Sequence, residues 1–68
     1  MCIRELNDHI EIQGAFHIKA WDNESCDCVT LACGSDFECD RWEVADEILE
    51  RRITYMYVVD NVLNIEVV

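Results

Sequence analysis

The chain has 68 residues, of which 15 are acidic and five are basic, so its formal charge is −10 at pH 7. This charge disfavours direct binding to nucleic acid or to an anionic membrane surface, and it favours a basic partner or a cation. The hydrophobic fraction of 51% excludes a disordered acidic tail. The length predicts one small domain that spans residues 1–68.

Cysteine usage indicates the cellular compartment. The chain contains five cysteines, an odd number, and no basic region followed by an apolar run after Met1. No apolar segment is long enough to cross a bilayer. We therefore expect reduced thiols in a cytoplasmic protein.

Residues 8–21 are expected to form a hairpin with a three-residue turn at 13–15. This register puts apolar residues together on one face and Gly14 where a positive φ is required. The expected cross-strand pairs are Ile12 with Phe16, Ile10 with Ile18 and, on the other face, Glu11 with His17. A polar loop over 22–27 follows this hairpin.

Residues 28–33 are expected to form a short strand that ends at Gly34. Strict alternation would place Val29, Leu31 and Cys33 on one face. Cys28, Thr30 and Ala32 would lie on the other face.

Residues 35–52 have the period of one amphipathic helix. Ser35 with Glu38, and Asp40 with Glu43, have the spacing of a capping box. The apolar face would contain Phe37, Trp42, Val44, Ala45, Ile48 and Leu49.

Residues 53–59 and 62–68 are expected to form a second hairpin, because both alternate around Asp60 and Asn61, which tolerate a left-handed backbone. A two-residue turn sets the register. The inner pairs would be Val58 with Leu63 and Met56 with Ile65, and the outer pairs Val59 with Val62, Tyr57 with Asn64 and Tyr55 with Glu66.

The predicted fold is therefore α+β in the order β-β-β-α-β-β. An antiparallel sheet would carry the single amphipathic helix on one face. The strand order is not predictable from the sequence.

The acidic helix face is the first candidate partner-binding surface. Glu43, Asp46, Glu47 and Glu50 follow the spacing i, i+3, i+4 and i+7, and form one stripe without interspersed bases. Asp36 and Asp40 extend this face. The alternative interpretation is a solvated outer face that keeps the protein soluble.

The outer face of the last hairpin is the second candidate surface. Tyr55, Tyr57, Val59 and Val62 would be exposed if the helix covers only the other face, and Trp21 could join them. Such a patch is typical of a partner-binding or self-association surface. The alternative is that the N-terminal segment or a curled sheet covers it.

The cysteines allow a metal site as a third possibility, because Cys26, Cys28, Cys33 and Cys39 supply four sulfurs. Their spacing differs from paired Cys-x2-Cys loops, so we expect ordinary thiols and no metal. We also expect no cofactor and no catalytic residues, because phosphate-binding loops, nucleophile elbows and paired metal-binding carboxylates are missing from the sequence.

In size, charge and layout the chain resembles the small acidic inhibitors made by phages and mobile elements, such as anti-CRISPR proteins and other DNA mimics. The resemblance implies a non-enzymatic inhibitor whose carboxylates occupy the basic groove of a nucleic-acid-binding enzyme. The alternatives are a homodimeric interaction module that uses the hydrophobic sheet face, and a small zinc protein.

Overall fold

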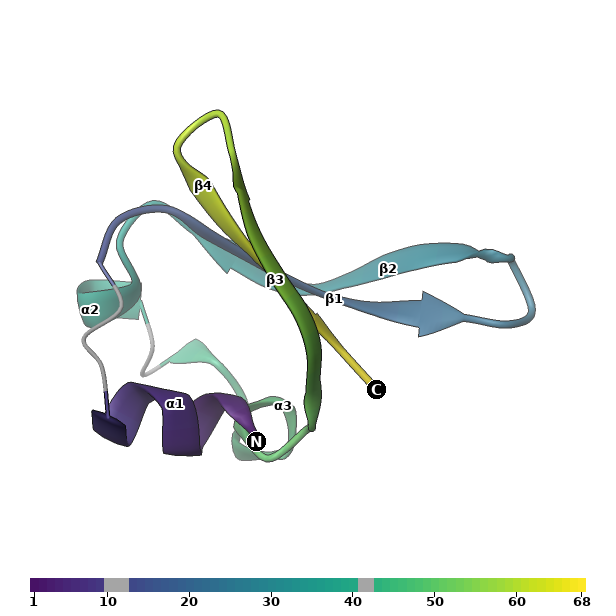
Figure 1. Cartoon of the computed structure of the whole chain (residues 1–68), viewed down its shortest axis with the longest axis horizontal. Coiled ribbons are helices and arrows are strands. Elements are labelled where there is room, and N and C mark those ends of the chain that lie inside the picture. Colours follow the sequence, from purple (N-terminus) through teal and green to yellow (C-terminus); the bar gives the residue numbers. More distant parts are fainter. Residues whose placement is uncertain (10–12, 41–42) are drawn as a thin grey trace.

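The computed structural model of the chain describes residues 1–9, 13–40 and 43–68. Within these residues the elements are α1 (Ile3–His9), β1 (Phe16–Asp22), β2 (Asp27–Gly34), α2 (Phe37–Asp40), α3 (Asp46–Leu49), β3 (Ile53–Val59) and β4 (Val62–Val67) (Figure 1). The fold is α+β, as the sequence predicts. The predicted order β-β-β-α-β-β is wrong, because a helix precedes the first described strand.

The described residues form a four-stranded sheet with the strand order β2-β1-β4-β3. The β1–β2 and β3–β4 pairs are antiparallel, whereas β1 and β4 run parallel. The predicted purely antiparallel sheet is therefore wrong. The two hairpins join through β1 and β4, and this junction buries Ile18 and Ile65 completely.

The predicted hairpin over residues 8–21 is wrong, because both sides of β1 are already paired. Ile18 pairs with Ala32 of β2 on one side and with Ile65 of β4 on the other. Residues 8 and 9 belong to α1. The expected partners Ile10, Glu11 and Ile12 lie outside the described residues.

The predicted register of the second hairpin is confirmed at all five expected pairs. Val59 pairs with Val62, Val58 with Leu63, Tyr57 with Asn64, Met56 with Ile65, and Tyr55 with Glu66. Asp60 and Asn61 form the turn with positive φ values of 51° and 64°. Two consecutive left-handed residues match the twist of the flanking strands, so the local sequence is sufficient to set this register.

Helix α1 was not predicted, yet it supplies part of the core. Its side chains Ile3 and Leu6 are buried, and so is Cys2, which precedes the helix. The backbone N–H of Ile53 donates to the carbonyl of Met1 at 2.8 Å, and Cys2 bridges to Arg52. The N-terminus is thereby attached to the start of β3.

The single helix predicted over residues 35–52 is wrong, because it is divided into α2 and α3. Ala45 is extended, with φ −60° and ψ 143°, and stands at the N-cap of α3. Trp42, expected on the apolar face, lies outside the described residues. Helix α1 covers part of the same sheet face, so one long helix is not needed to cover that face. The interruption at Ala45 also separates Glu43 from the acids of α3.

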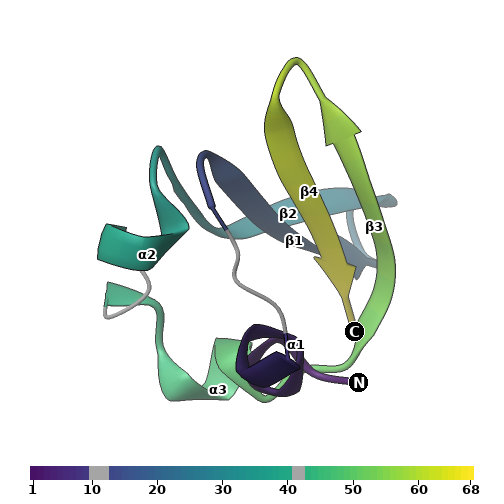
Figure 2. The same ribbon diagram turned by 60° about the vertical axis from the view of Figure 1, so that its left-hand side comes forward.

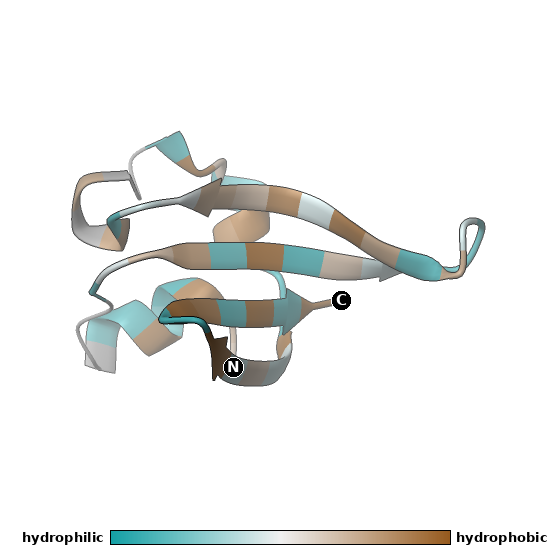
Figure 3. Cartoon of the chain, turned by 90° about the horizontal axis from the view of Figure 1, so that it is seen from above, coloured by the Kyte–Doolittle hydropathy of each residue, from teal (hydrophilic) through white to brown (hydrophobic). Residues whose placement is uncertain are grey.

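All three described helices lie on one side of the sheet, so the fold has two layers (Figure 2). Phe16 of β1 meets Phe37 of α2 edge to face, with ring centroids 5.0 Å apart and an interplanar angle of 83°. The core between the layers consists of Ile3, Leu6, Phe16, Ile18, Ala20, Phe37, Val44, Ile65 and Val67. Polar and apolar residues alternate along β1 and β4, as the colours in Figure 3 show.

The helix layer leaves the tips of both hairpins uncovered (Figure 1). Met56 and Val58 were expected inside, but 44% and 66% of their surfaces remain exposed. Their register is as predicted and their burial is not. The reason is their position on β3, an edge strand whose turn end extends beyond the helices.

Candidate binding surface

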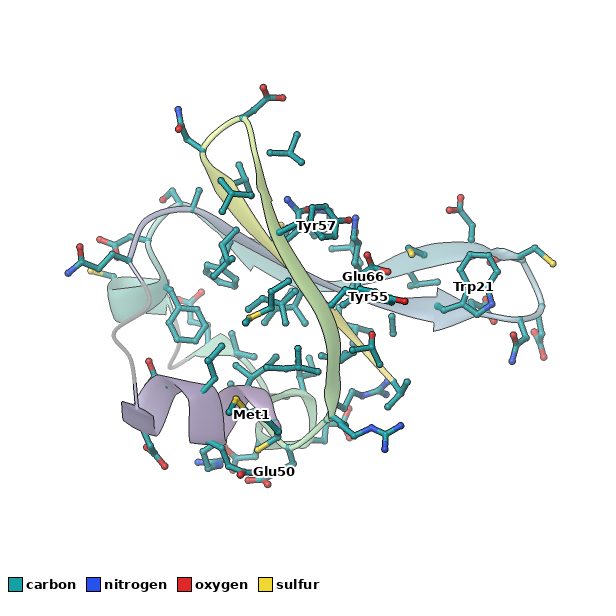
Figure 4. All side chains as sticks on the ribbon, in the orientation of Figure 1. Met1, Trp21, Glu50, Tyr55, Tyr57 and Glu66 are labelled. Carbon is teal, nitrogen blue, oxygen red and sulfur yellow. The ribbon has the colours of Figure 1, made fainter. Side chains whose placement is uncertain are left out.

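The outer face of the sheet, opposite the helix layer, combines aromatic and charged side chains. Alternation along the strands places Tyr55 and Tyr57 of β3, Glu66 of β4 and Lys19 of β1 on this face. Tyr55 is 68% exposed and Tyr57 is 38% exposed. Figure 4 shows these tyrosines close to Glu66. The expected aromatic surface is therefore exposed, and neither the N-terminal segment nor a curled sheet covers these two side chains.

Lys19 connects the aromatic and acidic parts of the outer face. Its Nζ lies 5.1 Å from the ring centroid of Tyr57, within the range of a cation–π contact. Hydrogen bonding to Tyr57, together with the charges of Glu66 and Cys28, raises the pKa of Lys19 above its usual value, and desolvation opposes this. The cation–π contact thus holds the ammonium group on this face.

A β-bulge changes which side chains of β2 lie on the outer face. Ile18 pairs with Ala32, but Lys19 pairs with Thr30, so Leu31 is the extra residue. Ala32 consequently packs toward the core, and Cys33 pairs with His17 on the outer face. The predicted division of β2 into two strictly alternating faces is wrong, because alternation does not reveal an inserted residue.

His17 was expected opposite Glu11, and the structure gives it other neighbours. Its Nε2 lies 2.8 Å from Oγ1 of Thr30. His17 also pairs in register with Cys33 on one side and Asn64 on the other. An imidazole and a thiol thus occupy adjacent strands, an arrangement that the sequence does not indicate.

A shallow, open hollow of about 450 Å³ lies on the outer face near the β3–β4 turn. Its lining includes His17, Lys19, Tyr57, Asp60 and Asn64. Its size and openness suit the side chain of a partner protein better than an enclosed small molecule.

Trp21 belongs to the distant end of this surface. It lies on the β1–β2 hairpin, away from the two tyrosines (Figure 4), and is 59% exposed. Its Nε1 donates to Oδ1 of Asn23 at 2.9 Å. The indole is thereby oriented by the turn that follows it.

The predicted acidic stripe is wrong as one continuous row. Glu43 precedes the interruption at Ala45, whereas Asp46 and Glu47 belong to α3 and Glu50 caps it. Arg4 of α1 donates to Asp46 at 3.2 Å and also to Glu50. A base distant in the sequence therefore partly neutralises two of the four carboxylates.

The remaining acidic candidates are dispersed over the helix layer. Glu43, Glu47 and Asp36 are exposed, and Asp36 accepts a contact from the thiol of Cys39 at 3.7 Å. The side chain of Asp40 lies outside what the structure describes. Figure 4 shows Glu50 among the helices, far from Tyr57. The structure therefore separates the acidic candidates from the aromatic ones.

The cysteines do not gather into a metal-binding cluster in the described parts of the chain. No three His, Cys, Asp or Glu side chains there are arranged to hold a metal ion. Cys28 lies opposite Trp21 and Cys33 opposite His17, which are four residues apart on β1. That separation corresponds to about 13 Å at roughly 3.3 Å per strand residue. The thiol of Cys28 contacts the carboxylate of Glu66 at 3.8 Å.

Three residues that shape the two candidate surfaces were not predicted from the sequence. Lys19 and Glu66 meet only because β1 and β4 are adjacent, and strand order has no local signal. Arg4 reaches α3 only because α1 packs beside it. The polar positions of the strands could identify Lys19 and Glu66 as outward residues, but not as neighbours.

The fold and surface together define an α+β protein with a four-stranded mixed sheet in its described residues, one covered face and one exposed aromatic face. Comparison with protein-family models, with curated proteins and with solved structures finds no match to this chain. Over the described ranges, no helix has both the length and the apolar character needed to cross a membrane.

Proposed function

We propose that this protein acts by binding another protein that has a basic surface, and not by catalysis. The observation that carries the proposal is the exposed pair Tyr55 and Tyr57 on the uncovered sheet face of a chain with a formal charge of −10. Glu66 lies beside these rings, and Asp60 lies at the end of their strand. Aromatic rings bordered by carboxylates are suited to arginine and lysine side chains.

The chain itself contains an example of this recognition. Lys19 lies over the ring of Tyr57 and beside Glu66, so the face already holds one cation by cation–π and charge interactions. Tyr55 is the more exposed ring and is free to contact a cation from a partner. Arginine is favoured over lysine, because its planar guanidinium can stack on a ring and also pair with a carboxylate.

The acidic helix layer supports a second candidate function, inhibition of a nucleic-acid-binding enzyme by mimicry of phosphates. The supporting observation is the exposure of Asp46 and Glu47, with 90% of the Asp46 side chain accessible. In this case the carboxylates, rather than the tyrosines, would enter a basic groove. The ion pairs of Arg4 with Asp46 and Glu50 reduce the charge available for such mimicry.

Either function is consistent with a cytoplasmic protein. The chain has five cysteines, and no disulfide joins them in the described structure. Reduced thiols are usual in the cytoplasm. We therefore propose that the protein is cytoplasmic.

A binding titration of the wild-type protein and two variants separates the two functions. A poly-arginine peptide serves as the probe and is titrated against the wild-type protein, the double variant Tyr55→Ala with Tyr57→Ala, and the variant Glu47→Lys. We expect the tyrosine variant to weaken binding by about tenfold or more, because aromatic anchors contribute most at such surfaces. Glu47→Lys should weaken the binding of poly-arginine only slightly at high salt.

The opposite ranking of the variants would favour the acidic helix layer. Equal binding by all three proteins would overturn the assignment of the sheet face. Circular dichroism of each variant serves as the folding control, and the same three proteins then test any partner captured from cells.

A further inference from the structure

Strand β3 forms one edge of the sheet, and the N-terminal residues cover only its first part. Cys2 bridges to Arg52 in the antiparallel sense, and the N–H of Ile53 donates to the carbonyl of Met1 at 2.8 Å. Figures 1 and 2 both show the N-terminus beside the start of β3, with the rest of the strand running away from it. In the described parts of the chain, no other segment pairs with this edge beyond Ile53.

A β-bulge separates the covered part of β3 from its open part. Ile53 pairs with Val67 of β4 and Tyr55 pairs with Glu66, so Thr54 is the extra residue. Beyond the bulge the pairing with β4 is regular, and the strand contains no charge and no proline. These are the features of an edge to which a further strand can be added. Residues 55–59 are called the open edge below.

The turn determines which backbone groups of the open edge point outward. Val59 and Val62 flank a two-residue turn, and such flanking residues form a hydrogen-bonded pair. Because hydrogen-bonded and non-hydrogen-bonded pairs alternate in antiparallel strands, Tyr57 also bonds to β4. The N–H and C=O groups of Met56 and Val58 therefore point away from β4, where an added strand can bond to them.

Two kinds of side chain flank the open edge. Tyr55 and Tyr57 project onto the outer face, whereas Met56 and Val58 project onto the opposite face, where the helices leave them exposed. The side chains of an added strand would alternate between the same two faces. One strand with apolar residues at alternate positions would thus cover Met56 and Val58, and its other residues would lie beside the two rings.

Charge indicates which residue of such a strand would lie beside the rings. Lys19 already lies over the ring of Tyr57, so a second cation at this ring would be repelled. Tyr55 is the more exposed ring, and its partner on β4 is Glu66. Adjacent strands are about 4.8 Å apart, so the backbone of an arginine opposite Tyr55 would lie about 10 Å from that of Glu66, within reach of two extended side chains.

We propose that the open edge accepts an extended segment of a partner protein, antiparallel to β3, with apolar residues opposite Met56 and Val58 and an arginine opposite Tyr55. The inference rests on the proposed function, because the partner is the same basic protein, and it adds the conformation in which that partner binds. Strand addition at a sheet edge uses main-chain hydrogen bonds for affinity and alternate side chains for specificity.

The N-terminal residues set the direction and the limit of the added strand. Cys2 already pairs antiparallel with Arg52, so an antiparallel strand on the open edge continues the direction of the N-terminal residues. Antiparallel pairing is also slightly more stable per residue than parallel pairing. The added strand ends where Met1 occupies the edge, and it therefore pairs with residues 55–59 alone.

Nuclear magnetic resonance of the full chain tests the pairing. The probe is the peptide valine-threonine-valine-arginine-valine, blocked at both ends, which would place its arginine opposite Tyr55 and its threonine opposite Tyr57. In the free protein the amide hydrogens of Met56 and Val58 should exchange quickly with solvent, whereas that of Tyr57 should be protected. At saturation the peptide should slow exchange at Met56 and Val58 by about tenfold or more.

Methylation of single peptide nitrogens gives matched controls with the same charge. The N–H of the central valine would bond to the carbonyl of Met56, so its methylation should weaken binding by about tenfold or more. The N–H of the threonine would point away from β3, so its methylation should have little effect. A peptide with glutamine in place of arginine should bind more weakly at low salt, and high salt should reduce this difference.

Two variants of the protein test the same edge from the other side. Val58→Pro removes an outward N–H without removing a bond to β4, and should weaken binding of the peptide by about tenfold or more. Val58→Thr retains this N–H and should bind the peptide as the wild-type protein does. The amide spectrum of each variant shows whether the fold is retained, and the methylated peptides test the proposal on the wild-type protein alone.

Four results would overturn the proposal. Equal binding of the two methylated peptides would indicate contact through side chains alone, which leaves the proposed function intact. Loss of binding only on methylation of the threonine would overturn the antiparallel register. Protection of Met56 and Val58 that rises with protein concentration, without peptide, would assign the edge to a second copy. Binding of poly-arginine but not of the probe would overturn only the added strand, whereas failure to bind either would overturn the proposed function as well.

Discussion

Arg4 of α1 donates through Nε to the carboxylate of Glu50, 46 residues later, and through a second nitrogen to Asp46. The contact joins the N-terminal helix to the end of α3. It also changes the expected effect of altering the acidic side chains. Hydrogen bonds to Glu50 and Asp46 raise the pKa of Arg4 above its usual value.

The first prediction concerns this ion pair. Glu50→Lys should lower Tm modestly, because it places a like charge beside Arg4. Glu47→Lys makes the same charge change without breaking a pair, and should leave Tm unchanged or slightly higher, because it reduces repulsion among the acids. Thermal melts at low and high salt provide the measurement, and the difference should shrink at high salt.

A charge exchange serves as the control for this contact. Arg4→Glu combined with Glu50→Lys should recover part of the loss, which Glu50→Lys alone cannot do. Equal Tm values for Glu50→Lys and Glu47→Lys would show that the contact has no effect on stability.

The second prediction separates register from burial. Ile65 is fully buried, whereas Val58 on the same sheet face is 66% exposed. Ile65→Asp should cost more than about 4 kcal/mol, because it buries an unpaired charge. Val58→Asp should cost no more than about 1 kcal/mol. Urea unfolding of both variants measures the difference, and global unfolding by Val58→Asp would contradict the exposed edge.

The third prediction concerns the thiols. Cys26 and Cys33 are exposed and should react quickly with a thiol reagent in the native protein, whereas Cys2 is buried and should be protected. After denaturation all five cysteines should react without prior reduction. Mass spectrometry of the labelled protein at successive times gives the order. Rapid native labelling of Cys2 would show that α1 does not stay packed on the core.

The fourth prediction concerns the β1–β2 turn. Cys26 has a φ of 54°, in the left-handed region that glycine adopts without penalty. Cys26→Gly should therefore raise stability by about 0.5–1 kcal/mol, the left-handed cost of about 1–2 kcal/mol less the greater chain entropy of glycine. Cys26→Ala is the matched control and should have little effect. Equal unfolding free energies for the two variants would show that the turn is not strained.

The sequence alone determined the elements whose causes are local. Asp60 and Asn61 tolerate the left-handed turn, and the alternation on either side then fixes the pairing of Tyr57 with Asn64. The strand that ends at Gly34 and the polar turn that precedes this strand were predictable for the same reason. Turn chemistry and two-residue alternation depend only on neighbouring residues.

The sequence did not determine the helical part of the fold. The periodicity of residues 35–52 predicts one helix, but Ala45 is extended, and the missed helix α1 shares the covered face of the sheet. Short helices depend on tertiary packing for most of their stability, so a local period does not fix their limits. The bulge at Leu31 was also missed, because one inserted residue leaves the surrounding composition unchanged.

Only the tertiary structure decided which surfaces are exposed for binding. Pairing of β1 with β4 brings Lys19 beside Glu66 and Tyr57, and packing of α1 brings Arg4 to Asp46 and Glu50. The position of β3 at the sheet edge leaves its apolar residues exposed. Composition determines how many charges and rings the chain has, whereas contacts between distant segments determine which of them are paired and which face solvent. Such contacts depend on strand order and layer packing, for which a single sequence contains no periodic signal.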